Sequence, residues 1–157
     1  MTVFVTGAAG FIGSALVRDL ILEDQEEVVS IDKLTYAGSE ENLVEIASSD
    51  CHHFEKVDIC DGTKISSLFE KYKPTAVYHL AAESHVDRSI DGPADFVQTN
   101  LVGTFTMLQA ALEYWRELGD VEQKAFRFLH VSTDEVYGEL GAEGYFSETS
   151  SYEPSSP

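Results

Sequence analysis

The chain has 157 residues, 43% of them hydrophobic, which is enough to bury the core of one domain. Its formal net charge of −18 at pH 7 argues against nucleic acid or an anionic membrane as a partner. The sequence also lacks both the basic region of a secretory signal and a run of roughly 18 apolar residues that could span a membrane, so we expect a cytoplasmic protein.

Cys51 and Cys60 lie nine residues apart, which fits neither a CxxC pair nor the Cys/His spacing of zinc sites. His52 and His53 adjoin Cys51, but this group offers no fourth ligand. We therefore expect reduced thiols and no metal site.

A glycine turn follows the first apolar run, Val3–Val5, and precedes apolar residues at helical spacing. Its glycines are Gly7, Gly10 and Gly13. A turn of small residues between a strand and a helix lets a dinucleotide pyrophosphate approach the free N–H groups of the helix. The spacing is Gly-x-x-Gly-x-x-Gly rather than the standard Gly-x-Gly-x-x-Gly, and alone it would also fit an ordinary turn.

The second apolar run, Val28–Ile31, ends in Asp32, 19 residues after Gly13. A carboxylate at this point can accept hydrogen bonds from the adenosine ribose and would repel a 2′-phosphate. Together with the glycine turn, Asp32 predicts a site for NAD rather than NADP. The alternative is a surface aspartate that caps the next loop.

The loop 33–38 is expected to wrap the adenosine end, and Ser39 is expected to cap a short helix whose apolar side is Leu43, Val44, Ile46 and Ala47. The third strand, His53–Val57, leads to Asp58. Asp58 could accept a hydrogen bond from the adenine amino group or cap a helix. Asp61 is the more natural cap of the next helix, which Pro74 terminates.

The fourth strand, Thr75–Leu80, leads into the small residues Ala81 and Ala82, against which a nicotinamide ribose could lie. Residues 93–118 are predicted to form one long helix with an apolar stripe. The stripe consists of Val97, Leu101, Phe105, Leu108, Leu112 and Trp115. Val102 and Met107 fall off this stripe, so a second buried face is also possible. A fifth strand, Phe126–Val131, leads to Thr133–Glu135.

Alternating strands and helices at this spacing predict an α/β fold with a doubly wound parallel sheet, a Rossmann-like NAD-binding domain over residues 1–157. Ligands of such folds bind beyond the carboxyl ends of the strands. Residues 141–157, rich in Ser, Gly, Pro and Glu, are expected to form a loop.

The adjacent carboxyl groups of Asp134 and Glu135, which follow Thr133 at a strand end, could act as an acid and a base with separated pKa values. From spacing alone, ordinary loop-capping acids are the better interpretation.

Four segments together change that interpretation: 6–13 (TGAAGFIG), 32–38 (DKLTYAG), 79–90 (HLAAESHVDRSI) and 132–138 (STDEVYG). On these segments the chain resembles the dTDP-glucose 4,6-dehydratases, nucleotide-sugar enzymes of the extended short-chain dehydrogenase/reductase family. The glycine motif is shared across that superfamily, whereas the Thr-Asp-Glu triplet and the SHVDRS stretch are more specific. The resemblance extends over essentially the whole chain.

The resemblance implies that tightly bound NAD+ oxidises C4 of dTDP-glucose, after which Glu135 removes the C5 proton and Asp134 protonates the departing C6 hydroxyl. NADH then returns the hydride to C6. Thr133 would hydrogen-bond the sugar near O4, and Ser84 would also lie near the substrate. The matching cofactor contacts, besides the three glycines, are Phe11, Ile12, Asp32, Lys33, Leu34, Thr35, Asp58, Ile59, Leu80, Ala81, Ala82, Ser84 and Thr99.

The family's first step also needs a Tyr-x-x-x-Lys pair, and no tyrosine of this sequence has Lys four residues on. The final Pro-Ser-Ser-Pro segment, 154–157, immediately precedes that tyrosine in the family. We therefore expect an N-terminal portion of such an enzyme with little or no turnover alone. A different sugar-nucleotide epimerase or dehydratase and a non-catalytic NAD-binding module are the alternatives. The family forms homodimers through two long helices from each subunit. The helix 93–118 would supply one of them, whereas the other would begin at the missing Tyr-x-x-x-Lys pair, so the resemblance leaves the pairing of this chain open.

Overall fold

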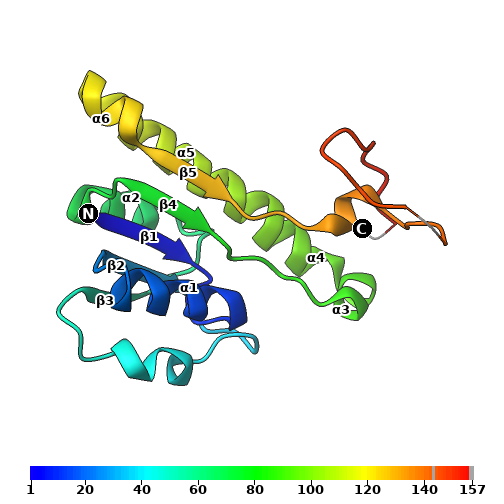
Figure 1. Ribbon diagram of the computed structural model, residues 1–157, viewed down its shortest axis with the longest axis horizontal. Coiled ribbons are helices and arrows are strands. Elements are labelled where there is room, and N and C mark those ends of the chain that lie inside the picture. The colour runs from blue at the N-terminus through cyan, green and yellow to red at the C-terminus, as the bar shows by residue number, and fades with distance from the viewer. Residues whose placement is uncertain (143, 156–157) are drawn as a thin grey trace.

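The computed structural model describes residues 1–142 and 144–155, and the side chains of all of these except residues 86, 87 and 91. Residue 143 of the predicted C-terminal loop and the last two residues of the Pro-Ser-Ser-Pro segment lie outside this range. Five parallel strands form one sheet in the order β3-β2-β1-β4-β5 (Figure 1). The strands are β1 (Thr2–Thr6), β2 (Glu27–Asp32), β3 (His52–Lys56), β4 (Ala76–His79) and β5 (Arg127–His130).

Helical segments cover both faces of the sheet, as a doubly wound fold requires (Figure 1). They are α1 (Phe11–Leu22), η1 (Glu40–Ile46), α2 (Gly62–Tyr72), α3 (Val86–Asp91), α4 (Pro93–Phe96), η2 (Val97–Gly103), α5 (Thr104–Glu117), α6 (Asp120–Ala125) and η3 (Asp134–Tyr137). Val3 and Val5 of β1 pack with α1 and η1, whereas Phe4 between them packs with α2 and α5. This alternation along β1 creates two separate apolar cores, and the predicted fold class is confirmed.

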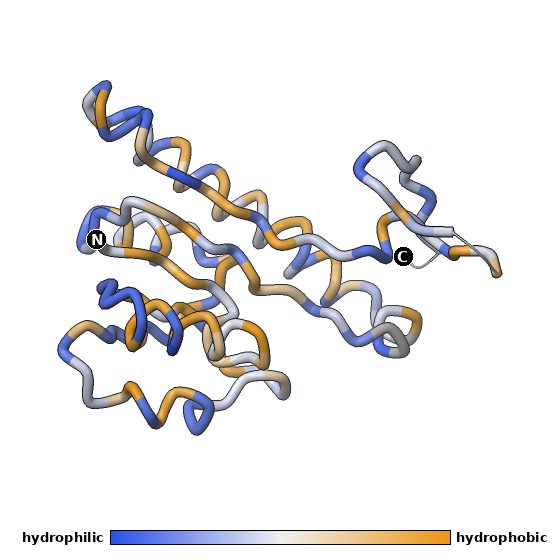
Figure 2. The backbone as a smooth tube through the Cα atoms, in the orientation of Figure 1, coloured by the Kyte–Doolittle hydropathy of each residue, from blue (hydrophilic) through white to orange (hydrophobic). Residues whose placement is uncertain are grey.

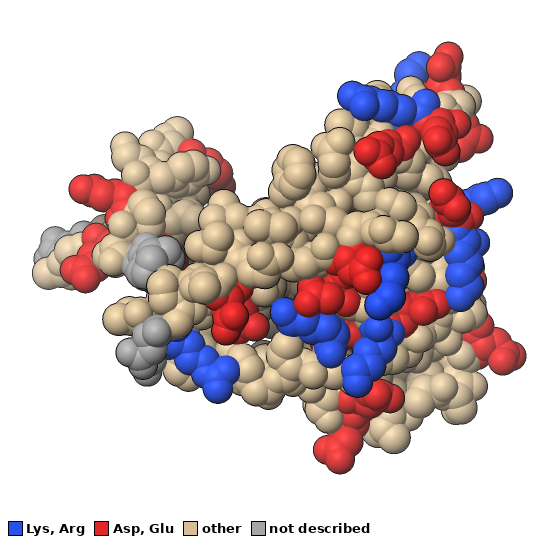
Figure 3. Space-filling view, turned by 180° about the vertical axis from the view of Figure 1, so that it is seen from behind, with Lys and Arg blue, Asp and Glu red and all other residues tan. Residues whose placement is uncertain are grey.

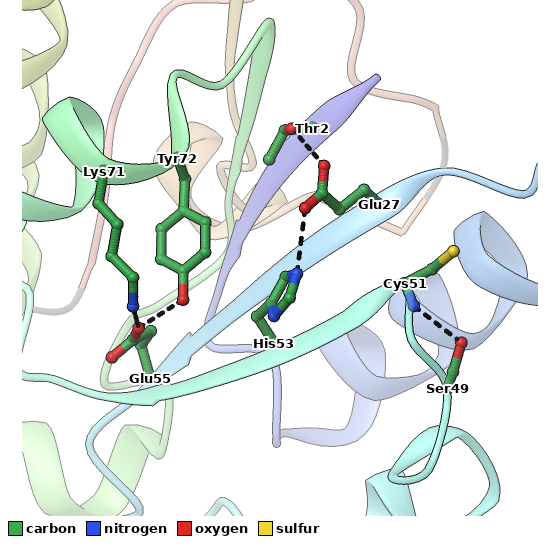
Figure 4. Close-up of polar contacts among 8 residues, drawn as sticks. All are labelled: Thr2, Glu27, Ser49, Cys51, His53, Glu55, Lys71 and Tyr72. Carbon is green, nitrogen blue, oxygen red and sulfur yellow. Dashed lines mark hydrogen bonds and ion pairs between the residues drawn. The ribbon is translucent and has the colours of Figure 1, made fainter.

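Polar contacts hold the edge strand β3 in place (Figure 4). Glu27 of β2 accepts hydrogen bonds from Thr2 at 2.7 Å and pairs with His53 at 3.0 Å. Glu55 accepts from Lys71 at 2.8 Å and from Tyr72 at 2.6 Å, which ties β3 to α2. The hydrogen bonds from Lys71 and Tyr72 lower the pKa of Glu55, so the carboxylate stays charged at neutral pH.

Two predicted helix caps are present. Ser39 accepts a hydrogen bond from the Glu41 amide at 3.2 Å, and Asp61 accepts from the Lys64 amide at 3.1 Å. The helix after Ser39 is a 3₁₀ helix that buries Leu43 and Ile46. Val44 and Ala47 were expected on the apolar side of this helix. Val44 is instead 74% exposed, because the tighter 3₁₀ turn changes which residues share a face.

The long helix predicted over 93–118 is correct in extent but wrong in the face it buries. It is continuous from α4 through α5, with a π-helical section, η2, in its middle. Met107, Ala110 and Ala111 are buried against α2 and the sheet, whereas the predicted stripe is exposed, with Leu101 and Phe105 each 64% accessible. The second face, on which Met107 lies, is therefore the one that builds the core.

The exposed stripe leaves a weakly charged area on the back of the molecule. Hydrophobic positions recur along the whole length of α5 (Figure 2). In the view from behind, charged side chains gather over α2 and around α6, whereas the area where α5 runs between them carries few (Figure 3). In the described part of the chain, no helix is both long and apolar enough to cross a membrane.

Candidate cofactor-binding site

The predicted cofactor residues follow the carboxyl ends of four parallel strands. The chain proceeds outward from β1 to β2 and β3, then returns to β4 on the other side of β1. The strand order thus reverses between β1 and β4, and ligands of open α/β sheets bind at such a point. Gly7, Lys33, Asp58 and Leu80 all lie at this edge of the sheet, just beyond the strand ends.

The glycine turn packs too closely for side chains at two of its positions. Gly7 has φ +67°, and a Cβ there would lie 2.8 Å from the backbone nitrogen of Ala81. A Cβ on Gly13 would come within 2.1 Å of the Gly7 carbonyl oxygen. At these contacts β1, the start of α1 and the segment after β4 come together. Because the two glycines carry no side chain, the turn presents its backbone to the site.

The N-terminus of α1 is open to an anion. Gly10 occupies the N-cap position without a side-chain hydrogen bond, and the first turn of this helix contains no acidic residue. By contrast, side chains cap η1 and α2. The first N–H groups of a helix lack intrahelical acceptors and carry partial positive charge. The start of α1, with the exposed residues Phe11 and Ile12, can therefore hold a pyrophosphate.

Asp32 connects the glycine turn to the next loop. Its Oδ2 accepts a hydrogen bond from the Ala9 amide at 2.9 Å, and its Oδ1 accepts from the Leu34 amide at 2.8 Å. Each carboxylate oxygen still has capacity for a further donor. The side chain is only half-buried, so ribose hydroxyls can reach it. Asp32 thus shapes the loop, as the capping alternative suggested, and is also placed for the predicted contact.

His79 supports the floor of the site, and sequence reasoning missed it. It is fully buried and hydrogen-bonds the Thr6 hydroxyl through Nδ1 at 2.7 Å and the Thr104 hydroxyl through Nε2 at 3.0 Å. The Thr6 hydroxyl also accepts from the Ala81 amide at 3.1 Å. Burial, with a smaller effect of His130, lowers the pKa of His79 to about 4, so it is neutral at physiological pH. A buried histidine at the end of an apolar strand gives no distinctive sequence signal.

The π-helical section η2 brings three residues to the site. Thr99 receives a contact from Lys33 Nζ at 3.4 Å, and Asn100 exchanges hydrogen bonds with the backbone of Glu83 at 2.8 and 2.9 Å. Gly103 lies so close to Ile59 that a Cβ would come within 2.5 Å of it. Predicted contacts Thr99, Lys33 and Ile59 are therefore brought together, whereas Asn100 was missed because a π turn cannot be recognised from periodicity.

Asp58 also faces Lys33, with Nζ 3.5 Å from Oδ2, and it accepts a hydrogen bond from the Cys60 amide at 2.9 Å. Partial burial raises the pKa of Asp58, but the hydrogen bonds from Cys60 and the charge of Lys33 outweigh it, and the net shift is downward. The charged carboxylate is able to accept a hydrogen bond from an amino group.

A groove of about 520 Å³ opens beside these residues. We call it the α4 groove. Residues of α4, of η2, of the loop after β2 and of the segment after β4 line it. The lining residues are Lys33, Thr35, Tyr36, Glu83, Arg88, Gly92, Asp95, Phe96, Gln98 and Thr99.

Thr133, Asp134 and Glu135 lie beyond the carboxyl end of β5, at the start of η3, and all three are exposed. Thr133 caps this short helix by accepting from the Glu135 amide at 3.2 Å, and its hydroxyl lies 3.5 Å from Asp134 Oδ1. Because all five strands are parallel, the triplet lies at the same edge of the sheet as the predicted cofactor residues. In Figure 1 this segment continues past the sheet toward the C-terminus.

A sequence model described as GDP-mannose 4,6 dehydratase matches residues 4–157. The chain belongs to this family. Among curated relatives, the dTDP-glucose 4,6-dehydratase of Haemophilus influenzae is 57% identical over 100% of this chain and 47% of its own length. The corresponding enzyme of Neisseria meningitidis is 54% identical over 99% of this chain and 44% of its own length. The chain thus spans about half the length of these family members.

Solved structures in the family's fold agree with the architecture. The dTDP-glucose 4,6-dehydratase of Streptomyces venezuelae, crystallised with NAD and TYD, superposes with a TM-score of 0.88 at 41% identity, covering 99% of this chain and 46% of that one. The UDP-glucose 4-epimerase of Thermus thermophilus, crystallised with NAD, gives 0.83 at 32% identity, covering 99% and 45%. The predicted resemblance to the N-terminal portion of dTDP-glucose 4,6-dehydratases is confirmed.

Proposed function

We propose that this chain binds NAD at the switch point between β1 and β4 and forms the N-terminal, NAD-binding part of a dTDP-glucose 4,6-dehydratase. The observation that carries the proposal is the uncapped start of α1 in contact, through Ala9, with the acid Asp32. An anion-binding helix terminus and a ribose-binding carboxylate are joined there in one rigid unit. Similar proteins whose structures contain NAD support the choice of cofactor.

Lys33, Leu34, Thr35, Asp58, Ile59 and Thr99 would surround the adenosine end, while Leu80, Ala81, Ala82 and Ser84 would lie along the rest of the cofactor. Asp32 favours NAD, because its negative charge would repel the 2′-phosphate of NADP. When bound, NAD would take up a hydride from C4 of the sugar and give it back at C6.

The acid–base steps belong to the residues after β5. Glu135 would remove the C5 proton as a carboxylate, and Asp134 in its acid form would protonate the departing C6 hydroxyl. Thr133 and Ser84 would contact the sugar of dTDP-glucose.

A sugar-nucleotide 4-epimerase is the second candidate, because epimerases are among the similar structures. An epimerase needs no proton transfer at C5 and C6, so it has no use for the Asp134–Glu135 pair. The pair therefore favours dehydration.

The exposed stripe on η2 and α5 supports a proposal of self-association. Six large apolar residues, each between 36% and 64% exposed, line one side of a continuous helix. Pairing with a second copy would remove this area from water. We propose a homodimer formed through this stripe.

Binding of NAD and NADP by the purified 157-residue chain, measured by isothermal titration calorimetry, tests the cofactor assignment. We expect binding of NAD with at least about tenfold preference over NADP. Since no tyrosine is followed by Lys at the required spacing, we expect no conversion of dTDP-glucose by this chain alone. Equal affinity for both dinucleotides, or binding of neither, would overturn the assignment, and measurable conversion would show that the tyrosine–lysine pair is dispensable.

A further inference from the structure

A hydrogen bond bridges the two loops that flank the proposed cofactor position. The Tyr36 hydroxyl donates to Glu83 Oε2 at 3.0 Å, although the two residues are 47 positions apart. Tyr36 directly follows Thr35, and Glu83 lies between Ala82 and Ser84. Thr35, Ala82 and Ser84 are proposed NAD contacts. Both residues also line the α4 groove together with Lys33. A bond between these two loops therefore joins two parts of the lining of the groove in which the cofactor would lie.

The two sides of the bridge differ in how firmly they are held. The Asn100 side chain holds the backbone of Glu83 through two hydrogen bonds. It accepts from the Glu83 amide at 2.8 Å and donates to the Glu83 carbonyl at 2.9 Å. Tyr36 lies in a turn closed by the Gly38 amide and the Thr35 carbonyl at 3.2 Å, and its side chain is 54% exposed. The bridge therefore joins a backbone segment anchored by Asn100 to an exposed side chain of the loop after β2.

Arg88 reinforces the closed arrangement. Its guanidinium carbon lies 3.8 Å from the centre of the Tyr36 ring, within the range of a cation–π interaction. Desolvation and the neighbouring Glu83 carboxylate raise the pKa of Tyr36, with Arg88 opposing them, so the hydroxyl keeps its proton and can donate. Three side chains from three segments thus meet above the groove.

We propose that Tyr36, Glu83 and Arg88 form a clasp across the α4 groove that slows the release of bound NAD. The clasp rests on the NAD binding proposed above. A closed clasp must open both for the dinucleotide to enter and for it to leave, so weakening it accelerates dissociation and association together. A contact that only stabilises the fold would change the unfolding temperature without this effect on the two rates.

The test is a stopped-flow displacement experiment on the full 157-residue chain. Protein loaded with NADH is mixed with excess NAD+, and the loss of nicotinamide fluorescence gives the dissociation rate. Tyr36→Phe keeps the ring against Arg88 and removes only the hydroxyl. We expect it to release NADH about fivefold faster and to bind NADH faster to a similar extent. Tyr145→Phe, at a 96% exposed tyrosine, is the matched control and should release NADH like the unmodified chain.

A double-mutant cycle separates the clasp from independent effects of its members. Glu83→Ala should also accelerate release, and the combined Tyr36→Phe/Glu83→Ala chain should release NADH no faster than the faster single variant, because both remove the same bond. Thermal unfolding of each variant establishes that it is folded. An unchanged dissociation rate in folded Tyr36→Phe, or fully additive effects, would overturn the clasp while leaving NAD binding intact. Failure of the unmodified chain to bind NADH would overturn the proposed function and the clasp with it.

Discussion

The carboxylate of Asp32 accepts a hydrogen bond from the Ala9 amide at 2.9 Å, which joins the end of β2 to the glycine turn after β1. Its other oxygen accepts from Leu34 at 2.8 Å. One side chain therefore orders both loops that would surround an adenosine ribose, and the binding site and its scaffold share a residue.

Asp32→Asn should weaken both roles of this residue. The asparagine amide keeps one acceptor oxygen for one of the two backbone amides, Ala9 or Leu34, but turns its NH₂ group toward the other. We therefore expect the free energy of unfolding to fall by about 1–2 kcal/mol. NAD affinity should fall about tenfold, and the preference for NAD over NADP should shrink because the repelling charge is gone. Denaturant unfolding and calorimetric titration measure these changes. Asp24→Asn, at an exposed aspartate after α1, serves as the control, and an unchanged NAD/NADP ratio in Asp32→Asn would contradict the ribose-binding role.

His79 should make folding stability depend on pH. Its pKa is lowered from 6.5 to about 4 in the folded chain, chiefly by burial. Between these values the unfolded chain binds more protons than the folded chain. The contribution of neutral His79 to the free energy of unfolding is therefore fully present above pH 6.5 and is lost as the pH drops toward 4. The full shift corresponds to about 3 kcal/mol.

Urea unfolding between pH 6.5 and 4.5 measures this effect together with that of His52, whose pKa burial also lowers, whereas the carboxylates whose pKa values are lowered contribute mainly at lower pH. Comparison with a His79 variant separates the two histidines. His79→Gln should be less stable at neutral pH and should show a flatter pH dependence across this interval. His85→Gln, at an exposed loop histidine, should keep the slope of the unmodified chain. An identical slope in His79→Gln would show that another group causes the dependence.

Local signals predicted most of the fold. The five strands, the caps Ser39 and Asp61, and the glycine turn each depend on a few neighbouring residues whose chemistry restricts the backbone directly. Asp32 was also predicted in the correct place, since the end of a strand after a glycine turn and a helix is fixed by the topology of the fold.

Features that depend on tertiary partners could not be predicted in the same way. Periodicity identified the apolar stripe through Leu101 and Phe105 but could not show that Met107, Ala110 and Ala111 form the packed face. Small residues allow α5 to approach the sheet closely, whereas the larger stripe residues remain between 36% and 64% exposed. His79 and Asn100 were missed because their importance arises from atoms distant in sequence, namely Thr6 and Glu83.

Gly13→Ala should disrupt the glycine turn. The new Cβ would lie 2.1 Å from the Gly7 carbonyl oxygen, and neither backbone segment can move without opening the packing between β1 and α1. We expect a loss of about 3 kcal/mol or more in unfolding free energy and the loss of NAD binding. Gly62→Ala is the matched control: its Cβ would be 3.4 Å from a Thr106 methyl group, and alanine is a better helix former in α2. Normal stability of Gly13→Ala would contradict the close approach seen here.

The exposed stripe on α5 should drive self-association of the isolated chain. Phe105, 64% exposed at the middle of the stripe, would be buried when two copies pair. Phe105→Glu would place a charge in that interface without disturbing the core, because Met107, Ala110 and Ala111 face the sheet from the other side of the helix. Sedimentation velocity over a range of concentrations should show a dimer for the unmodified chain and a monomer for Phe105→Glu. Val121→Glu, at a 77% exposed residue of α6 outside the stripe, should leave the dimer intact. If the unmodified chain is monomeric throughout, or if Val121→Glu dissociates the dimer as effectively, the stripe is not the interface.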